Sequence, residues 1–208
     1  MTESNRIYRY QEDRDFNILL QRVQGISVVD APRLHVLHQM ARHYSPGNIA
    51  EVGVYMGGSA LVICKGAEGS IVDLFDTFEG MPKTDPVLDI HREGEFKASL
   101  EDVKMFLADC PNARFYPGFF PDSIAHTAEE DGARQYSFVH VDVDIYQSAK
   151  DCLHYFYPRM ILGGTIVFDD YSFRSTPGVK TAIDEFLADK REKIIDINTG
   201  QGLLIKHA

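Results

Sequence analysis

The chain of 208 residues lacks any apolar run close to the roughly 18 residues that a membrane-spanning helix needs. Its first segment, Met1 to Arg14, is polar and has no apolar stretch of the kind found in secretory signals. The two absences together predict a cytoplasmic protein that has no membrane partner.

Cysteine is also scarce. The three cysteines, Cys64, Cys110 and Cys152, are odd in number and lack the spacing of a metal site. Each lies on the apolar face of an expected helix or at a helix end. We therefore expect reduced packing residues and no disulfide framework.

Positive charge is in short supply, because 21 Lys and Arg residues stand against 31 Asp and Glu residues and give a formal net charge of −10. No basic stripe offsets this excess, so a nucleic acid is not expected as the main partner. An acidic chain suits a metal ion or a cationic ligand. With 44% hydrophobic and 25% charged residues, the composition is typical of a globular protein with a substantial core.

Apolar patterns with the periods of helices and strands alternate along the sequence. The expected helices cover residues 16–23, 32–43, 59–67, a segment after Ser99, a short segment from about Asp122, 149–157 and 177–187. The expected strands cover residues 49–52, 70–75, 113–116, 138–141, 166–168, 193–197 and 203–206. This order predicts a single α/β domain over residues 1–208, with a helical cap (1–47) and a core (48–208) whose mainly parallel sheet has one antiparallel strand from the final hairpin.

Residues 77–98 have no clear period and contain several glycines and prolines. A stretch of this length without regular structure is more often a lid or a binding loop than a simple connector. His91 and Arg92 lie within it. Two interpretations of these side chains remain open, contact with a ligand or simple solvation.

Two apolar strands each run directly into aspartates, the first into Asp142 and Asp144 and the second into Asp169 and Asp170. A helix and a Gly163-Gly164 turn are expected between them, which makes a strand-helix-strand unit. Such crossovers join parallel strands that are usually neighbours, so Asp142 and Asp169 should emerge at the same sheet edge. Because clustered carboxylates repel one another, a cation or a shared proton is expected there.

A glycine-rich turn, EVGVYMGGS over residues 51–59, follows the first core strand and opens a helix. This arrangement presents backbone N–H groups to a ligand. A dinucleotide-binding turn needs Gly-x-Gly-x-x-Gly, but Tyr55 stands at the position of the second glycine. S-adenosylmethionine has no phosphate and carries a sulfonium cation, which tolerates or favours an acidic neighbour such as Glu51.

Asp76 ends the second core strand, where its carboxylate could accept both hydroxyls of a ribose. Gly118 and Phe119 follow the third core strand. These two residues fit either the wall of an adenine site or the core, and both interpretations remain open.

Five motifs in this order resemble the macrocin O-methyltransferase family, over about Pro32 to Lys206: EVGVYxGGS from Glu51, DTFEGMP from Asp76, HVDVDxY from His140, YPR from Tyr157, and a pair of glycines leading to DDY at Asp169. The resemblance implies a Rossmann-like class I methyltransferase with a seven-stranded sheet, helices on both faces and S-adenosylmethionine as cofactor. It also implies O-methylation of a small-molecule hydroxyl, such as that of a sugar in a natural product, and a homo-oligomer. The chain is short at its N-terminus for this family, which bears on acceptor recognition and subunit contacts.

Carried over by position, the resemblance and the reasoning above give three sets of expected site residues. Mg²⁺ is expected at Asp142, Asp169 and Asp170. The expected cofactor contacts are Glu51, Gly53, Tyr55, Gly58, Ser59, Asp76, Thr77, Phe78, Gly118, Phe119 and Asp142. The expected acceptor contacts are His91, Tyr171 and Arg174.

Methyl transfer requires a hydroxyl oxygen to attack the sulfonium methyl group, and a metal that binds two neighbouring oxygens would activate one of them. We expect Asp142 to act as general base while it remains a metal ligand. His140 is interpreted as a buried, hydrogen-bonded residue, and Lys150 as exposed and not catalytic. Asp144 could line the site or cap the helix that follows it, and the cap is the favoured interpretation. Two other hypotheses remain open: an NAD-dependent oxidoreductase, and a non-catalytic module that binds a nucleotide or a metal.

Overall fold

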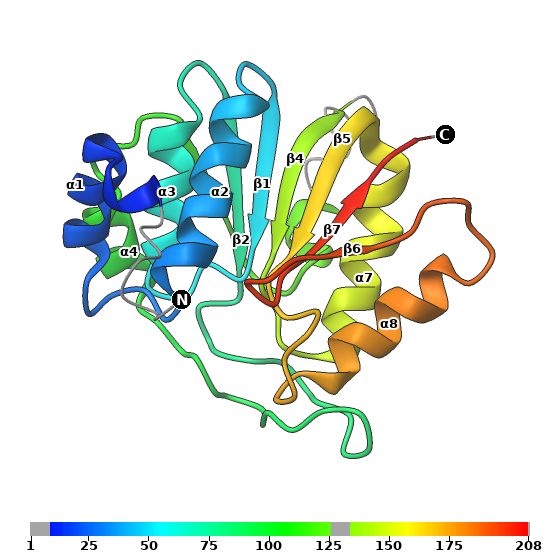
Figure 1. Cartoon of the computed structure of the whole chain (residues 1–208). Coiled ribbons are helices and arrows are strands. Elements are labelled where there is room, and N and C mark those ends of the chain that lie inside the picture. Colours follow the sequence, from blue (N-terminus) through cyan, green and yellow to red (C-terminus); the bar gives the residue numbers. More distant parts are fainter. Residues whose placement is uncertain (1–8, 126–133, 208) are drawn as a thin grey trace, which may run out of the picture.

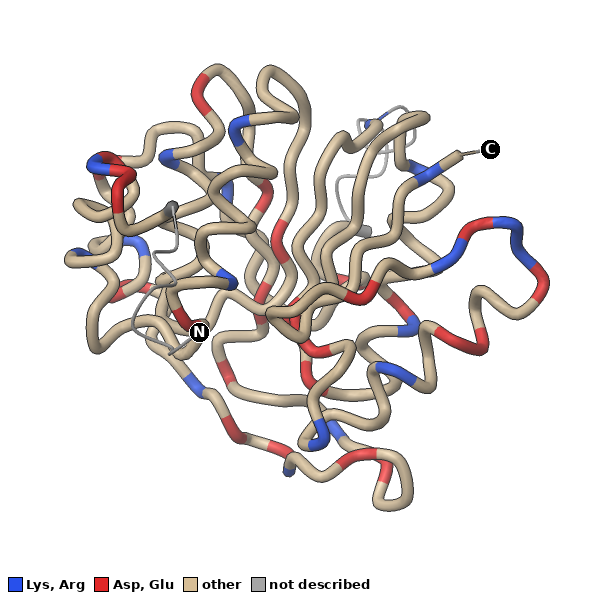
Figure 2. The backbone as a smooth tube through the Cα atoms, viewed as in Figure 1, with Lys and Arg blue, Asp and Glu red and all other residues tan. Residues whose placement is uncertain are grey.

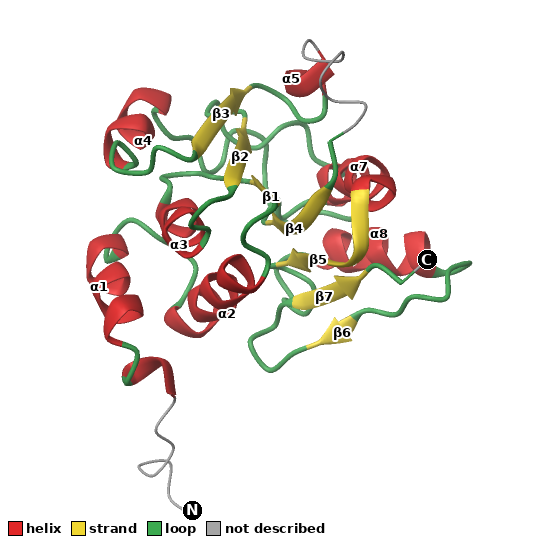
Figure 3. Cartoon of the chain, turned by 90° about the horizontal axis from the view of Figure 1, so that it is seen from above, coloured by secondary structure: helices red, strands yellow, loops and turns green. Residues whose placement is uncertain are grey.

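A seven-stranded sheet with strand order β3-β2-β1-β4-β5-β7-β6 forms the centre of the computed structural model, which describes residues 9–125 and 134–207 (Figures 1 and 3). Only β7 runs antiparallel to its neighbours, and the other pairs are parallel. The predicted fold class is therefore confirmed. The strands are β1 (Asn48–Val52), β2 (Ile71–Asp76), β3 (Ala113–Pro117), β4 (Tyr136–Val141), β5 (Met160–Phe168), β6 (Ile195–Asp196) and β7 (Gly202–Ile205).

Helices cover both faces of this sheet (Figure 3). One face carries α1 (Arg14–Val23), α2 (Ala31–His43), α3 (Gly58–Gly66) and α4 (Leu100–Phe106), and the other carries α5 (Asp122–Ala125), α7 (Tyr146–Phe156) and α8 (Pro177–Leu187). Two short 3-10 helices are η2 (Arg9–Gln11) and η3 (Tyr157–Arg159). Among the described residues, none of the helices has the length and apolar character to cross a membrane. The first eight residues of the expected cap lie outside the described residues.

Side-chain caps fix where the N-terminal helices begin. Asp13 accepts a hydrogen bond from the backbone N–H of Phe16 at the start of α1, and Asp30 accepts one from Arg33 at the start of α2. An N-cap of this kind typically contributes about 1 kcal/mol to helix stability. Because Asp30 fixes where α2 begins, it also fixes the position of Arg33 in the first turn of that helix.

Alternation along the central strands divides the core into two layers. Ile49 and Phe138 pack against α1, α2 and α3, whereas Ala50 and Val139 pack against α7 and α8. The strand period of two then places the next residues, Glu51 and His140, on the α1–α3 face, where they are paired in register. Two ionisable side chains are thereby buried beside each other. The three cysteines are free and buried, which is the packing role expected for them.

The structure corrects the expected turn at Gly163 and Gly164. Both glycines lie inside β5, which begins at Met160 and shifts register against β4 between Tyr136 and Phe138. Gly163 has φ +80°, and a Cβ on Gly164 would lie 3.0 Å from the carbonyl oxygen of Ser137. The pair therefore makes an irregularity within a strand, which is a common place for glycine.

The loop over residues 77–98 contains no helix or strand and passes beneath the carboxyl ends of the central strands (Figure 1). Asp89 fastens it to the body of the protein, since its Oδ1 accepts the backbone N–H of Tyr146 at 2.8 Å, in the first turn of α7. A Cβ on Gly178, in α8, would lie 2.3 Å from that same oxygen, so only glycine leaves room for the contact. We call residues 77–98 the lid.

Removing the Asp89 carboxylate should loosen the lid. Losing a cap on a helix N-terminus costs about 1 kcal/mol, so Asp89→Ala should speed local amide exchange in residues 77–98 by roughly fivefold. Hydrogen exchange with mass spectrometry measures this. Glu93→Ala, an exposed change within the lid, is the control, and equal exchange in the two variants would contradict the fastening role of Asp89.

Candidate active site

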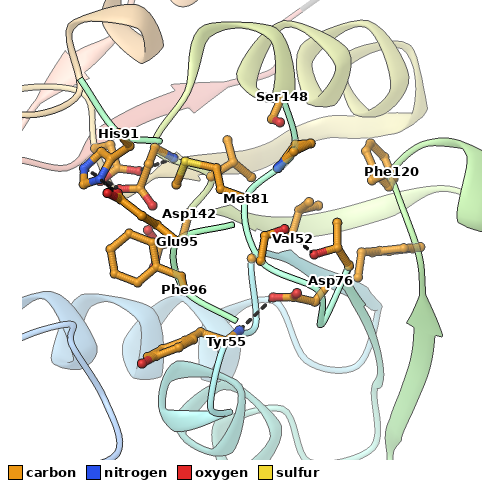
Figure 4. A pocket seen from close by; sticks show the side chains of 18 of the residues that line it. Val52, Tyr55, Asp76, Met81, His91, Glu95, Phe96, Phe120, Asp142 and Ser148 are labelled. Atoms are coloured by element: carbon orange, nitrogen blue, oxygen red, sulfur yellow. Dashed lines mark hydrogen bonds and ion pairs between the residues drawn. The ribbon is translucent and has the colours of Figure 1, made fainter. Parts of the chain in front are cut away.

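A cavity of about 330 Å³ opens at the carboxyl ends of β1 and β4, the point where the strand order reverses. This position is the usual ligand site of an open α/β sheet. Figure 4 shows His91, Glu95 and Asp142 at one side of the cavity and Phe120 at the other, with Asp76 between them. The acidic side chains are therefore gathered at one side of the cavity, which also holds the Phe96 ring.

The glycine-rich turn forms one wall, and its first glycine is required by close packing. A Cβ on Gly53 would lie 1.7 Å from the carbonyl oxygen of Asp142, and Gly53 has φ +94°. Tyr55 adopts a left-handed conformation with φ +48°, which is uncommon for a residue with a large side chain. Such backbone strain persists only where the surroundings support it.

Asp76 supplies that support. Its Oδ2 accepts the backbone N–H groups of Val54 and Tyr55, each at 2.8 Å, and its Oδ1 accepts the N–H of Phe78 at 2.6 Å. The carboxylate therefore braces the turn in addition to lining the cavity. Three of the four lone-pair sites of the carboxylate are thus used, and one site on Oδ1 is still available to a ligand hydroxyl.

Acidic residues line the opposite wall, and acidic positions gather along the backbone below the ends of the central strands (Figure 2). Ligand atoms of Asp142, Asp144 and Asp170 all lie within 4.8 Å of one another, and those of His140, Asp142 and Asp169 do so as well. Of the three expected metal ligands, Asp170 lies in the first group, Asp169 lies in the second, and Asp142 belongs to both. Asp144, in the first group, was not among the expected ligands.

Burial and mutual repulsion both raise the pKa values of these carboxyl groups. Burial, followed by the charges of Asp169 and Asp170, holds the pKa of Asp142 well above its usual value. Burial and the charge of Asp144 do the same to the pKa of Asp170. Burial also raises the pKa of Asp144 to about 6, although His91 opposes it. Oxygen ligands that are buried or partly buried and resist ionisation without a counter-charge fit a hard divalent cation such as Mg²⁺.

Behind the cavity lies a buried row of charged side chains. His140 is fully buried, with Nδ1 2.9 Å from Glu51 Oε1 and Nε2 3.5 Å from Asp169 Oδ1. Burial opposes a charge on this ring, but hydrogen bonds and charges from Asp169 and Glu51 outweigh burial and raise the pKa of His140 to about 9. His140 is therefore an imidazolium at neutral pH, in the buried and hydrogen-bonded role predicted for it.

Of the three expected metal ligands, Asp169 is the one whose negative charge is balanced by positive side chains. Gln201 Nε2 donates to its Oδ1 at 2.8 Å, and Arg33 in α2 pairs with its Oδ2. Burial would raise the pKa of Asp169, but His140, Arg33 and Gln201 together lower it. Sequence reasoning missed Arg33 and Gln201, because their contacts with Asp169 span 136 and 32 residues.

The structure brings most of the expected site residues to the cavity and leaves others outside it. Those that line it are Gly53, Tyr55, Asp76, Thr77, His91, Gly118, Phe119, Asp142 and Asp170. Those absent from the lining are Glu51, Gly58, Ser59, Phe78, Asp169, Tyr171 and Arg174. Phe119 is 39% exposed, so it belongs to the cavity wall and not to the core.

Physical reasons account for three of these departures. The Glu51 carboxylate is engaged with His140 on the α1–α3 face, so the structure moves it away from the expected cofactor contact. The Tyr171 hydroxyl donates to Asp184 and is buried against α8. Arg174 is exposed and points to no described partner in the cavity.

Asp144 also departs from expectation, because it does not cap α7. The N-cap of that helix is Ile145, and the N–H of Tyr146 is bound by Asp89 from the lid. Asp144 instead lines the cavity, where its Oδ1 lies 3.8 Å from His91 Nε2. His91 is itself bound to Glu95 at 2.8 Å, so the lid and the acidic wall meet at this point.

Comparison with known proteins assigns the chain to a family. The sequence profile of the macrocin O-methyltransferase family (TylF) matches residues 21–199. The chain belongs to this family. Curated members include a demethyldecarbamoylnovobiocin O-methyltransferase from Streptomyces niveus, 29% identical over 74% of this chain and 63% of that protein. A mycinamicin III 3''-O-methyltransferase from Micromonospora griseorubida is 28% identical over 73% of this chain and 65% of its own length. The chain thus spans less than two thirds of these relatives.

Solved structures of O-methyltransferases share the fold of this family member. The O-methyltransferase NovP superposes with a TM-score of 0.74 and 26% identity, over 88% of this chain and 83% of that one. TomG from Streptomyces achromogenes, solved with SAM, gives 0.66 with 17% identity over 100% of both chains. At that identity the second likeness bears on the fold alone.

The raised pKa values of the cluster predict a pH-dependent cost to stability. A carboxyl whose folded-state pKa lies above its unfolded value contributes fully to stability below the unfolded pKa of about 4, and loses that contribution as the pH rises through the folded-state pKa. Asp170→Asn should therefore be more stable than the wild type at about pH 8 in EDTA, by roughly 1–2 kcal/mol, and no more stable near pH 4. Urea unfolding at the two pH values measures this. Asp189→Asn, whose side chain is 85% exposed, is the control, and a gain for Asp170→Asn that does not change with pH would contradict the assignment.

Proposed function

We propose that the protein is an S-adenosylmethionine-dependent O-methyltransferase that acts on a hydroxyl of a small molecule bearing two neighbouring oxygens, such as a sugar or another vicinal diol of a natural product. One observation carries the proposal: a single cavity has the braced glycine turn on one wall and the carboxylate cluster on the other. Membership of the family supports it. A cytoplasmic location and a homo-oligomer remain predictions from the sequence.

The donor side of the cavity suits S-adenosylmethionine. The Asp76 carboxylate holds the turn in place and keeps one lone-pair site, on Oδ1, for a ribose hydroxyl. Gly118 and Phe119 form a wall on which an adenine ring would stack. The Tyr55 side chain, 5.6 Å from the Phe96 ring and perpendicular to it, joins the turn to the lid and helps to exclude water.

On the acceptor side, Asp142, Asp169 and Asp170 are the proposed ligands of a divalent cation. When bound, the ion would lower the pKa of an acceptor hydroxyl and hold the adjacent oxygen. Asp142 is proposed to receive the hydroxyl proton as the new O–C bond forms and the C–S bond of the sulfonium breaks, which leaves a neutral thioether. His91, on the lid, closes this side of the site beside Asp144.

The two competing hypotheses lack comparable support. A dinucleotide would need close backbone approach where Tyr55 stands in a left-handed conformation. A non-catalytic module that binds a nucleotide or a metal would fit the same turn and cluster, but the chain belongs to a family named for an O-methyltransferase, which favours an enzyme. Calorimetric titration with S-adenosylmethionine and then with NAD, each with and without Mg²⁺, separates the methyltransferase from the oxidoreductase, and binding of NAD alone would sink the proposal. Turnover separates the methyltransferase from a non-catalytic module.

Replacing Asp142 should separate binding from turnover. Asp142→Asn is expected to reduce methyl transfer by about a thousandfold or more, because it removes a ligand and the proposed base together, while S-adenosylmethionine still binds. The assay is mass spectrometry for one added methyl group across a panel of vicinal diols, with EDTA as a metal control. Asp189→Asn should match the wild type. A turnover-competent Asp142→Asn protein would remove Asp142 from the mechanism.

A further inference from the structure

Arg33 enters the acidic wall from outside the sheet. Its side chain is 14% exposed, lines the cavity and pairs through Nη1 with Oδ2 of Asp169, which is completely buried. The residue lies in the first turn of α2, and no other Lys or Arg lines the cavity within the described residues. A single positive side chain therefore lies directly against one of the proposed metal ligands.

Asp169 does not need Arg33 to hold its orientation. Its Oδ1 already accepts the Gln201 amide at 2.8 Å and faces His140 Nε2 at 3.5 Å. What Arg33 adds is a positive charge on Oδ2, the oxygen that those two side chains leave free. That oxygen is also the one on which Asp169 could bind a cation.

Arg33 has other partners that do not involve Asp169. Its Nη2 lies 3.3 Å from the carbonyl oxygen of Val28, its Nε lies 3.4 Å from Asp30 Oδ2, and its guanidinium lies over the Phe173 ring at 5.0 Å from the centroid. The side chain can therefore leave Asp169 and keep a carboxylate, a carbonyl and an aromatic face around it. These contacts coexist with the pair to Asp169, so the guanidinium remains partnered when that pair opens.

We propose that Arg33 is a built-in competitor for the divalent cation, which occupies Asp169 until the metal displaces it and so weakens metal binding. This inference rests on the proposed function only in its choice of Mg²⁺ as the ion. The exchange keeps Asp169 neutralised in both states, first by the guanidinium and then by the metal. It also couples metal loading to α2 and to the mouth of the cavity at Val28.

Metal binding by the EDTA-stripped full-length protein, without cofactor or acceptor, tests the proposal. Mg²⁺ and Mn²⁺ are titrated calorimetrically into the wild type, Arg33→Met and Arg33→Lys. Arg33→Met keeps the length of the side chain and removes its charge, so its dissociation constant should be lower by about tenfold or more. Arg33→Lys keeps the charge and should stay within about threefold of the wild type. Arg42→Met, an exposed change on the same helix, should match the wild type.

The result that would overturn the proposal is an Arg33→Met protein that binds both ions with wild-type or weaker affinity, since Arg33 would then only position Asp169. Absence of metal binding in every variant would overturn it equally. Should Arg33→Met fail to fold, by circular dichroism, Arg33→Gln replaces it with the same expectation. Tighter binding by the neutral variant, together with no methylation of any acceptor, would sink the proposed function and leave the role of Arg33 standing.

Discussion

The contact between Gly53 and Asp142 holds the two halves of the site together. Gly53 packs on the carbonyl oxygen of Asp142 so closely that a Cβ would lie 1.7 Å away, and the N–H of Asp142 bonds to Val52 at 2.9 Å. These contacts join the ends of β1 and β4 at the switch point of the sheet. The donor turn and the carboxylate cluster start from this junction, so a side chain at residue 53 would disturb both at once.

A second constraint is the balance of charge behind that junction. Glu51, His140 and Asp169 form a buried row in which one imidazolium lies between two carboxylates, and Arg33 adds a second cation at its outer end. Buried charges are tolerated only when they are paired. Asp142 and Asp170 lie just beyond this row, and burial together with the charges of neighbouring carboxylates raises their pKa values. The fold thus neutralises one part of the cluster and leaves the other part to a ligand.

Local pattern sufficed for the sheet and for much of the site. Apolar runs ending in aspartates placed Asp142 and Asp169 on adjacent parallel strands, as the pairing of β4 with β5 confirms. The same period of two could have predicted that the Glu51 side chain points away from the cavity. Its neighbour Val52 lines the cavity, and successive strand residues point to opposite faces. Glu51 is therefore on the face where its strand partner His140 lies. Sequence patterns could not predict the roles of Arg33, Asp89 and Gln201. Each acts through a contact with a distant segment, and no local period encodes such a contact.

On the proposed function, those distant contacts would also allow one scaffold to serve different acceptors. The donor wall is made by the ends of β1, β2 and β3, whereas the acceptor wall takes Val28 and Arg33 from the segment around the start of α2, His91 from the lid and Phe173 from the loop after β5. Changes in these outer segments leave the turn and its brace at Asp76 untouched. Acceptor preference can therefore vary while the donor site stays fixed, in keeping with family members whose names refer to molecules as different as a novobiocin precursor and mycinamicin III.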